Sequence, residues 1–260
     1  MGYVKMTSYL ELKDIEKSYP TEQGTIKVLK NIKLQIKKNE FITILGPSGC
    51  GKSTLLKIIA GFLKAEKGKI LKKEKEIKKT NLDRVMLFQD FEQLFPWQTV
   101  LNNIIFAVKA ASQNKKEKLN KKEIESRALN YLKEVKLASY RDYYPHQLSG
   151  GMKQRVALAR TLASESEIML MDEPFGSVDS QTRRELQHLL NEIWQEEEKT
   201  VIFVTHDIRE AVFLADKIVL MKNEPGEIIA EVENNLSRPR NRNSLKFNQL
   251  FEQLQYKLEN

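Results

Sequence analysis

The sequence has a single cysteine, Cys50, among its 260 residues, which excludes a disulfide framework within the chain. One free thiol fits a protein that works in a reducing compartment. Long hydrophobic runs are also missing: the longest, such as 104–108, have five or six residues, whereas a membrane-spanning helix needs about 20. The first ten residues lack the apolar stretch of a signal peptide. These absences argue against a disulfide-rich secreted protein and against a membrane-embedded chain.

The overall composition is that of an ordinary globular protein, with 41% hydrophobic and 30% charged residues. The length predicts one large domain or two small ones. The net charge of +8 is concentrated in two segments, 64–79 and 115–127, and Lys outnumbers Arg by 32 to 11. Nucleic-acid readers tend to use Arg-rich stripes, so we expect no nucleic-acid partner. The two segments are interpreted as solvated surface, with weak attraction to anionic lipid headgroups as the alternative.

Strands and helices alternate along most of the chain. Strands are expected at 9–19, 26–36, 41–45, 84–89, 167–171, 200–205, 217–221 and 227–232. Helices are expected at 52–60, 181–198, 207–215 and 243–258. The stretch 99–164 is predicted to be mainly helical, with a polar interruption near 112–122. This order predicts an α/β fold with a mainly parallel sheet, right-handed crossovers and an inserted helical subdomain.

A phosphate-binding loop is the clearest motif. Residues 46–53 fit G-x-x-x-x-G-K-[ST], between an apolar strand and a helix as this motif requires. Glycines let successive backbone N–H groups face a phosphate, and the helix N-terminus adds a positive dipole end. Lys52 should reach the β- and γ-phosphates, and the Ser53 hydroxyl should bind Mg²⁺. The residues expected to bind nucleotide here are Gly46, Pro47, Ser48, Gly49, Cys50, Gly51, Lys52, Ser53 and Thr54. Cys50 is interpreted as a spacer rather than as a reactive thiol.

A second motif is the apolar run 168–171, which ends in two carboxylates, Asp172 and Glu173. Ligands bind at the carboxyl ends of strands in open α/β sheets. Asp172 suits a Mg²⁺ ligand, and Glu173 suits a base that polarises the attacking water. Together with the phosphate loop, this strand predicts a nucleotide-hydrolysing core.

A third motif is Leu148-Ser149-Gly150-Gly151-Met152, about 20 residues before the strand that carries Asp172. Ser149 and the two glycines open a helix that should run to about Ala163. A Ser cap followed by glycines makes a second anion site at a helix N-terminus. This motif lies far along the chain from residues 46–53, so it does not obviously serve the same phosphate loop.

With these motifs in order, residues 7–232 resemble the ATP-binding subunit of ABC transporters. The resemblance implies a P-loop NTPase (RecA-like) core with an antiparallel β subdomain and an inserted α-helical subdomain. It implies one ATPase domain over 1–232. Its core with the β subdomain would span 1–90 and 161–232, its helical subdomain 91–160, and a tail with a short helix 233–260.

The same resemblance assigns roles to further residues. Tyr19 matches the aromatic that stacks on adenine, and Gln89 the glutamine that contacts Mg²⁺ and the water. Asp179 matches the loop that crosses the dimer interface, and His206 the histidine at the γ-phosphate. In this family, Ser149 with Gly150 and Gly151 completes the ATP site of a second copy. Two copies would therefore hold two ATP head to tail, with Glu173, His206 and Gln89 as catalytic residues and Ser53, Gln89 and Asp172 around Mg²⁺.

The motif at 95–100, Met152, Trp194 and 203–216 resemble the nitrate/sulfonate/taurine importer branch, which includes transporters of thiamine-precursor pyrimidines. The resemblance implies permease partners, an indirect solute-binding protein that is periplasmic or a lipoprotein, and a place on the cytoplasmic face of the membrane. Segment 238–242 is either a mark of this branch or a solvated basic tail. Among the apolar residues Phe91, Leu94, Phe95 and Trp97, at least one of Phe95 and Trp97 is expected in a groove for the permease, with plain core as the alternative.

Two departures from the family pattern are visible: Val178 replaces the usual Leu, and 70–79 lacks the usual glycine turn between two strands. The competing functions are another importer branch, a soluble ABC ATPase of repair or translation, and an unrelated P-loop GTPase or kinase. The last would leave 149–151 unexplained. The single cassette without a long heptad run disfavours the soluble class.

Overall fold

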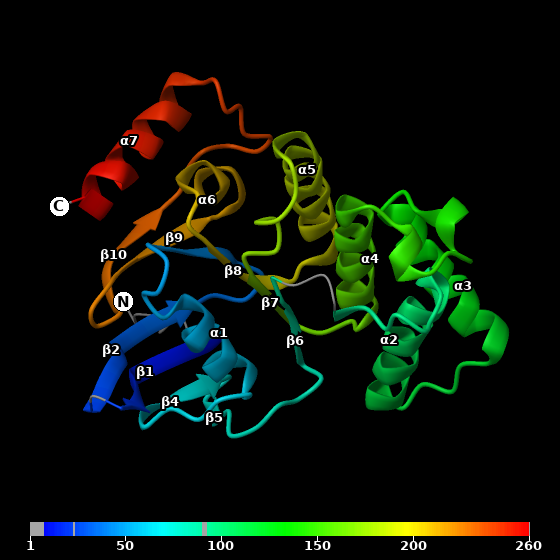
Figure 1. Cartoon of the computed structure of the whole chain (residues 1–260), viewed down its shortest axis with the longest axis horizontal. Coiled ribbons are helices and arrows are strands. Elements are labelled where there is room, and N and C mark those ends of the chain that lie inside the picture. The colour runs from blue at the N-terminus through cyan, green and yellow to red at the C-terminus, as the bar shows by residue number, and fades with distance from the viewer. Residues whose placement is uncertain (1–7, 23, 90–92, 260) are drawn as a thin grey trace, which may run out of the picture. The chain divides into compact units, whose positions relative to one another are not determined.

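The computed structural model describes residues 8–22, 24–89 and 93–259. The chain divides into two compact units (Figure 1): the first unit is Met1–Asn81 with Thr200–Asn260, and the second unit is Leu82–Lys199. In the part of the chain described, no helix combines the length and hydropathy needed to cross a membrane. The finer subdomain bounds expected from the sequence stay a prediction.

An antiparallel sheet of four strands forms one layer of the first unit, in the order β2-β1-β4-β5. Its strands are β1 (Leu10–Thr21), β2 (Gly24–Ile36), β4 (Lys67–Lys72) and β5 (Lys75–Glu76). The missing glycine does not prevent the β4–β5 hairpin. Lys73 and Glu74 form its two-residue turn at φ of 47° and 66°, the left-handed backbone that such hairpins require.

A second group of strands in the first unit has the order β10-β9-β3-β8. These are β3 (Phe41–Leu45), β8 (Thr200–Thr205), β9 (Lys217–Lys222) and β10 (Glu227–Glu233). Strand β3 runs parallel to β8 and β9, while β10 pairs antiparallel with β9. The residues of β3 and β8 are all buried, which explains why both read as continuous apolar runs. Three helices accompany these strands: α1 (Lys52–Ala60), α6 (Ile208–Leu214) and α7 (Leu245–Glu259).

The described part of the second unit combines two parallel strands, β6 (Arg84–Leu87) and β7 (Ile168–Asp172), with four α-helices. The helices are α2 (Val100–Lys115), α3 (Lys121–Glu134), α4 (Gly150–Ala163) and α5 (Ser180–Glu197). Helices α2, α3 and α4 pack against one another (Figure 1). The expected polar interruption lies between α2 and α3, where Asn120 starts α3 with a capping box.

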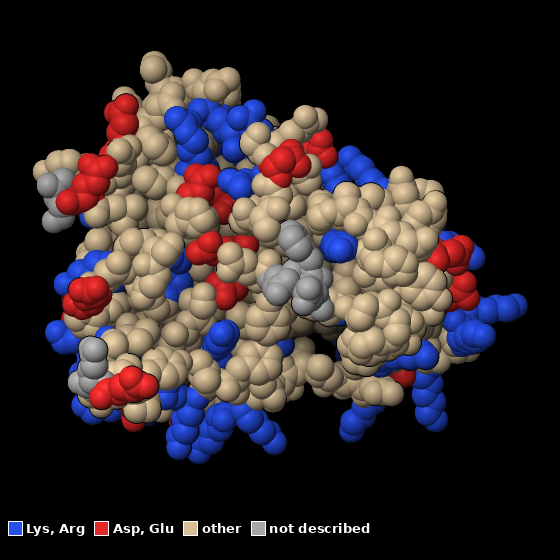
Figure 2. Space-filling view, in the orientation of Figure 1, with Lys and Arg blue, Asp and Glu red and all other residues tan. Residues whose placement is uncertain are grey.

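The lysines of segment 64–79 lie mainly at the surface. Seven of the eight are exposed, and Lys72 is half-buried. Figure 2 shows Lys and Arg side chains gathered beside β4 and β5. Some of them pair with acids of the same unit: Lys67 lies 3.3 Å from Glu16, and Lys78 lies 3.5 Å from Glu76. Such exposed pairs stabilise the fold weakly, so this segment behaves as solvated surface in the structure.

Candidate nucleotide-binding and hydrolysis site

The phosphate loop follows β3 directly and ends where α1 begins. Gly51 is the N-cap of α1 at φ 92° and has no side chain to cap the helix; the N–H groups of such a helix N-terminus are the donors that bind phosphate in this kind of loop. Pro47, Ser48 and Gly49 form an exposed tip, while Cys50 is buried. A β-carbon on Gly46 would lie 2.5 Å from the Met221 carbonyl oxygen. Gly51 is therefore required by its backbone conformation, and Gly46 is required by its close packing.

Lys52 lies inside this loop, with 4% of its surface exposed. Its Nζ donates hydrogen bonds of 2.8 Å to the carbonyl oxygens of Gly46 and Pro47. The ammonium is thus held at the mouth of the loop, where a bound phosphate would be its charged partner.

Gly226, in the β9–β10 hairpin, supports the loop from a distant part of the sequence. Its N–H donates to the Val28 carbonyl at 3.0 Å, and its own carbonyl accepts from Lys30 N at 3.0 Å. A β-carbon at Gly226 would lie 2.1 Å from the Cys50 carbonyl oxygen. Sequence reasoning missed this residue; the only local signal is the Pro225-Gly226 turn dipeptide.

His206 follows β8 at the same edge where the phosphate loop leaves β3. Leu45 and Thr205 are register partners in the parallel β3–β8 pair, so Gly46 and His206 are the next residues on adjacent strands. The His206 side chain is exposed. After it, Asp207 caps α6 by accepting from Arg209 N and Glu210 N. The structure therefore brings His206 and the loop to one sheet edge, as ligand binding in α/β sheets requires.

Tyr19 lies elsewhere in the first unit, on β1 of the four-stranded sheet, and is half-buried. The Lys17 ammonium lies 5.2 Å from the centroid of its ring, a cation–π distance. Its expected stacking on adenine stays a prediction.

In the second unit, Asp172 and Glu173 stand at the carboxyl end of β7. Asp172 is 6% exposed, and Glu173 is half-buried with φ of 43°. Left-handed backbone at a non-glycine residue is uncommon and is typical of turns and functional sites. Here it starts the turn in which Gly176 N donates to the Glu173 carbonyl at 3.1 Å.

Gln89 lies beside this turn. Leu87 pairs with Met171 in the parallel β6–β7 pair, and Gln89 and Glu173 each lie two residues after this pair. A β-carbon built on Gly176 would lie 3.7 Å from Gln89 Nε2 and 4.0 Å from Glu173 Cβ. Within the second unit, the structure therefore brings the predicted glutamine and the predicted base together. Asp90, Phe91 and Glu92, which follow Gln89, lie outside the described residues.

Ser149 caps α4 as expected: its Oγ accepts from Met152 N at 3.3 Å. Ser149 and Gly150 are exposed. Gly151 lies against the start of α5, because a β-carbon there would be 2.5 Å from Thr182 Cγ2. Asp179 caps α5 by accepting from Gln181 N and Thr182 N at 3.0 Å. Hydrogen bonds from Thr182 lower the pKa of the Asp179 carboxyl. The glycine motif and the expected interface loop thus meet through Thr182.

A further contact joins α4 to the segment after β7. Gln154 is 2% exposed, and its Nε2 donates to the Pro174 carbonyl at 2.5 Å. Pro174 directly follows Glu173, so Gln154 fixes the backbone beside the predicted base. The sequence places Gln154 after the glycine motif but gives no signal for this contact.

The sequence model of the family described as ABC transporter matches residues 29–176. This chain belongs to the ABC transporter family. It is 43% identical to an aliphatic sulfonates import ATP-binding protein of Bacillus thuringiensis over 93% of this chain and 92% of the relative. It is 40% identical to a nitrate import ATP-binding protein of Synechococcus elongatus over 92% of this chain and 86% of that protein.

The structure also resembles a solved dimeric ATP-binding cassette in a post-hydrolysis state, bound to ADP and phosphate. The TM-score is 0.76 and the sequence identity 34%, covering 88% of this chain and 100% of the other. These findings confirm the α/β cassette fold and the likeness to the nitrate/sulfonate branch. This ABC protein is an ATP-binding subunit, an ATPase coupled to import. The soluble ABC ATPase and the unrelated GTPase or kinase are not favoured.

Proposed function

We propose that two copies of this chain bind two ATP molecules head to tail and drive a permease through cycles of closure and hydrolysis. The exposed start of α4 carries this proposal. Ser149 and Gly150 offer a capped helix N-terminus to solvent, and Gly151 lies against the α5 start that Asp179 caps. A second copy could present its ATP to this surface.

The proposed chemistry uses the two groups of residues described above. Lys52 and the N–H groups of the loop bind the phosphates, and His206 contacts the γ-phosphate from the same sheet edge. Glu173, with Gln89 beside it, holds and polarises the attacking water. A positioned base contributes about 10²–10⁴-fold to a hydrolysis rate. Closure of the dimer adds Ser149–Gly151 of the other copy to the phosphate.

The donors expected around Mg²⁺ fit that ion. Ser53, Gln89 and Asp172 offer hydroxyl, amide and carboxylate oxygens, the atoms that Mg²⁺ prefers. Among the described residues, no group of three His, Cys, Asp or Glu side chains forms an all-protein metal cage. Mg²⁺ in nucleotide sites is held by one or two protein ligands with phosphate oxygens and water, and it would neutralise charge on the phosphates here.

We further propose that the permease docks on an aromatic hollow in the second unit. Its volume is about 380 Å³, and its walls include Phe95, Trp97 and Phe106. Trp97 is 70% exposed and Phe106 57%, whereas Leu94 is core at 3%. The Phe95 ring stacks on Trp97 at 5.6 Å and meets Phe106 edge-on at 5.0 Å. Large exposed aromatics around a hollow are typical of a protein-binding site.

Buried Asn103 makes this hollow rigid. Its Oδ1 accepts from Phe95 N at 2.8 Å, and its Nδ2 donates to the Phe95 carbonyl at 3.2 Å. It is fully buried, so these bonds are shielded from water. A fixed docking surface suits a subunit that transmits closure to the permease.

The named relatives act in sulfonate and nitrate import, so the proposed solute is a small anion of that kind or a pyrimidine thiamine precursor. We place the chain on the cytoplasmic face of the membrane, with a solute-binding protein acting indirectly through the permease and no nucleic-acid partner.

Mixing two inactive variants tests the head-to-tail arrangement. Ser149→Arg should abolish hydrolysis yet leave ATP binding by the isolated monomer nearly intact, because Ser149 serves the partner's ATP. Glu173→Gln removes the base. In a mixed dimer, one site carries both defects and the other carries neither. The mixture should therefore hydrolyse ATP measurably above either variant alone.

The control is Thr99→Arg, which removes a comparable helix cap: Thr99 Oγ1 accepts from Asn102 N at 3.2 Å at the start of α2. Losing such a cap costs about 1 kcal/mol, and this variant should keep wild-type hydrolysis. Loss of monomer ATP binding in Ser149→Arg would assign Ser149 to the chain's own site and refute the sandwich.

A further inference from the structure

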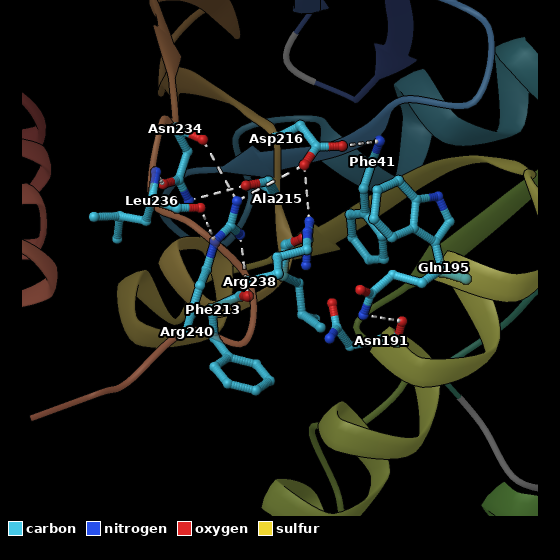
Figure 3. Close-up of polar contacts among 12 residues, drawn as sticks. Phe41, Asn191, Gln195, Phe213, Ala215, Asp216, Asn234, Leu236, Arg238 and Arg240 are labelled. Atoms are coloured by element: carbon cyan, nitrogen blue, oxygen red, sulfur yellow. Dashed lines mark hydrogen bonds and ion pairs between the residues drawn. The ribbon is translucent and has the colours of Figure 1, made fainter.

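The end of α6 is held by three side chains of the C-terminal tail. The last hydrogen bond within this helix runs from Ala215 N to Ala211 O, which leaves the carbonyls of residues 212–215 without helical partners. Asn234 Nδ2 donates to the Val212 and Ala215 carbonyls at 2.9 Å. Arg240 donates hydrogen bonds to the Val212 and Phe213 carbonyls, and Arg238 donates one to the Leu214 carbonyl (Figure 3). All four carbonyls therefore receive a tail hydrogen bond.

The two arginines make most of these contacts. Arg240 Nη1 donates to the carbonyls of Val212 and Phe213 at 3.2 and 3.1 Å. Arg238 Nη2 donates to the Leu214 carbonyl at 2.6 Å. Cations at a helix C-terminus also face the negative end of its dipole. The tail thus provides both the hydrogen bonds and the charge that this helix end lacks.

Asp216 connects the same arginines to the strand that leads into the phosphate loop. Its Oδ1 accepts from Arg238 Nη2 at 2.9 Å and lies 3.7 Å from Arg240 Nη2. Its Oδ2 accepts from Phe41 N, the first residue of β3, at 3.1 Å, and Asp216 N donates to the Phe41 carbonyl at 2.7 Å. Figure 3 shows Asp216 between Phe41 and the two arginines.

This part of the tail is not a solvated basic segment. Arg240 is 8% exposed, and burial, with the nearby charge of Arg238, lowers the pKa of its guanidinium to about 10. It is still protonated at neutral pH. Arg242 adds a cation–π contact at 4.1 Å from the Phe213 ring centroid. A buried charge is costly unless it is well hydrogen-bonded, so such a placement indicates a specific role.

We propose that Asn234, Arg238 and Arg240 form a brace that positions His206 for hydrolysis. The inference rests on the proposed role of His206 at the γ-phosphate. Asp207, the residue after His206, caps one end of α6, and the brace holds the other end. Because α6 has only seven residues, a shift at its C-terminal end reaches its N-terminal end. Through Asp216, the brace also ties α6 to β3, whose far end starts the phosphate loop.

The test measures ATP binding and hydrolysis by the full-length chain carrying Arg240→Met. We expect kcat to fall at least about tenfold, since displacements near 1 Å have effects of that size or larger, while the ATP Kd changes less than about twofold. Lys246→Met is the matched control, because Lys246 is an exposed cation of the same tail; it should leave both values unchanged. Arg238→Gln, which keeps the Arg240 contacts, serves if Arg240→Met does not fold.

A double-mutant cycle with His206→Ala separates positioning from general destabilisation. If the brace acts through His206, Arg240→Met should change the single-turnover rate by less than about twofold in the His206→Ala background. An equal loss in both backgrounds, or a parallel loss of ATP affinity, would overturn the brace and leave the proposed function standing. Wild-type turnover in His206→Ala alone would overturn both the brace and the proposed role of His206.

Discussion

Gly226→Ala should damage the phosphate loop although residue 226 lies far from it in the sequence. The added β-carbon would lie 2.1 Å from the Cys50 carbonyl oxygen and 2.7 Å from that of Val28. Real β-carbons essentially never approach closer than 3.0 Å, so the backbone segments at residues 226 and 50 must move apart by about 0.9 Å or more. Both clashing atoms belong to backbone, which cannot rotate away as a side chain can.

The expected cost has two parts. Overpacking of this kind lowers the free energy of unfolding by about 1–3 kcal/mol. A displacement near 1 Å in the loop would also lengthen or break hydrogen bonds from its N–H groups to the phosphates, and a hydrogen bond to a charged group contributes about 1.5–3 kcal/mol. We therefore expect ATP affinity to fall by about one to two orders of magnitude in a chain that remains folded.

Calorimetric titration with ATP and urea unfolding measure the two effects separately. The control is Ile229→Ala on the same hairpin, where the side chain is 42% exposed and truncation should change neither value appreciably. An ATP affinity within about twofold of wild type in folded Gly226→Ala would refute the support assigned to this glycine; twofold corresponds to about 0.4 kcal/mol.

Two other substitutions separate nucleotide binding from permease docking. Lys52→Ala should weaken ATP binding at least about tenfold, because hydrogen bonds to a charged group contribute about 1.5–3 kcal/mol; unchanged affinity in a titration would place the phosphates elsewhere. Trp97→Ala should leave the stability and ATPase rate of the isolated chain near wild type, since its side chain is 70% exposed. It should also reduce co-purification with the permease, and normal co-purification would exclude the hollow as the docking site.

The sequence predicted the elements that carry the motifs closely because their signals are local. The apolar run before Gly46 and the phosphate loop after it place β3 and the start of α1 at the predicted residues. Ser149 marks the start of α4 through its own side chain. The turn at Lys73 and Glu74 was harder, since both residues adopt positive φ, a conformation that glycine or asparagine usually signals.

The contacts that the sequence did not reveal join distant segments. Gly226 touches Cys50 only because the β9–β10 hairpin packs beneath the loop. In the sequence, Arg240 is one basic residue among others in the tail. It is buried because it donates hydrogen bonds to carbonyls at the end of α6 that have no partner within the helix. No local propensity encodes such partners, since each depends on how the chain packs in three dimensions.

The association state of Glu173→Gln tests most directly the central claim, that two copies close on ATP. The substitution removes the carboxylate that we propose as the base at the end of β7 but leaves Lys52 and Ser53, which we propose bind the nucleotide. Light scattering on the purified variant should give the mass of one chain without nucleotide and of two chains with Mg-ATP. Turnover should fall by about 10²–10⁴-fold. A monomer at saturating Mg-ATP, or turnover near the wild-type rate, would contradict the claim.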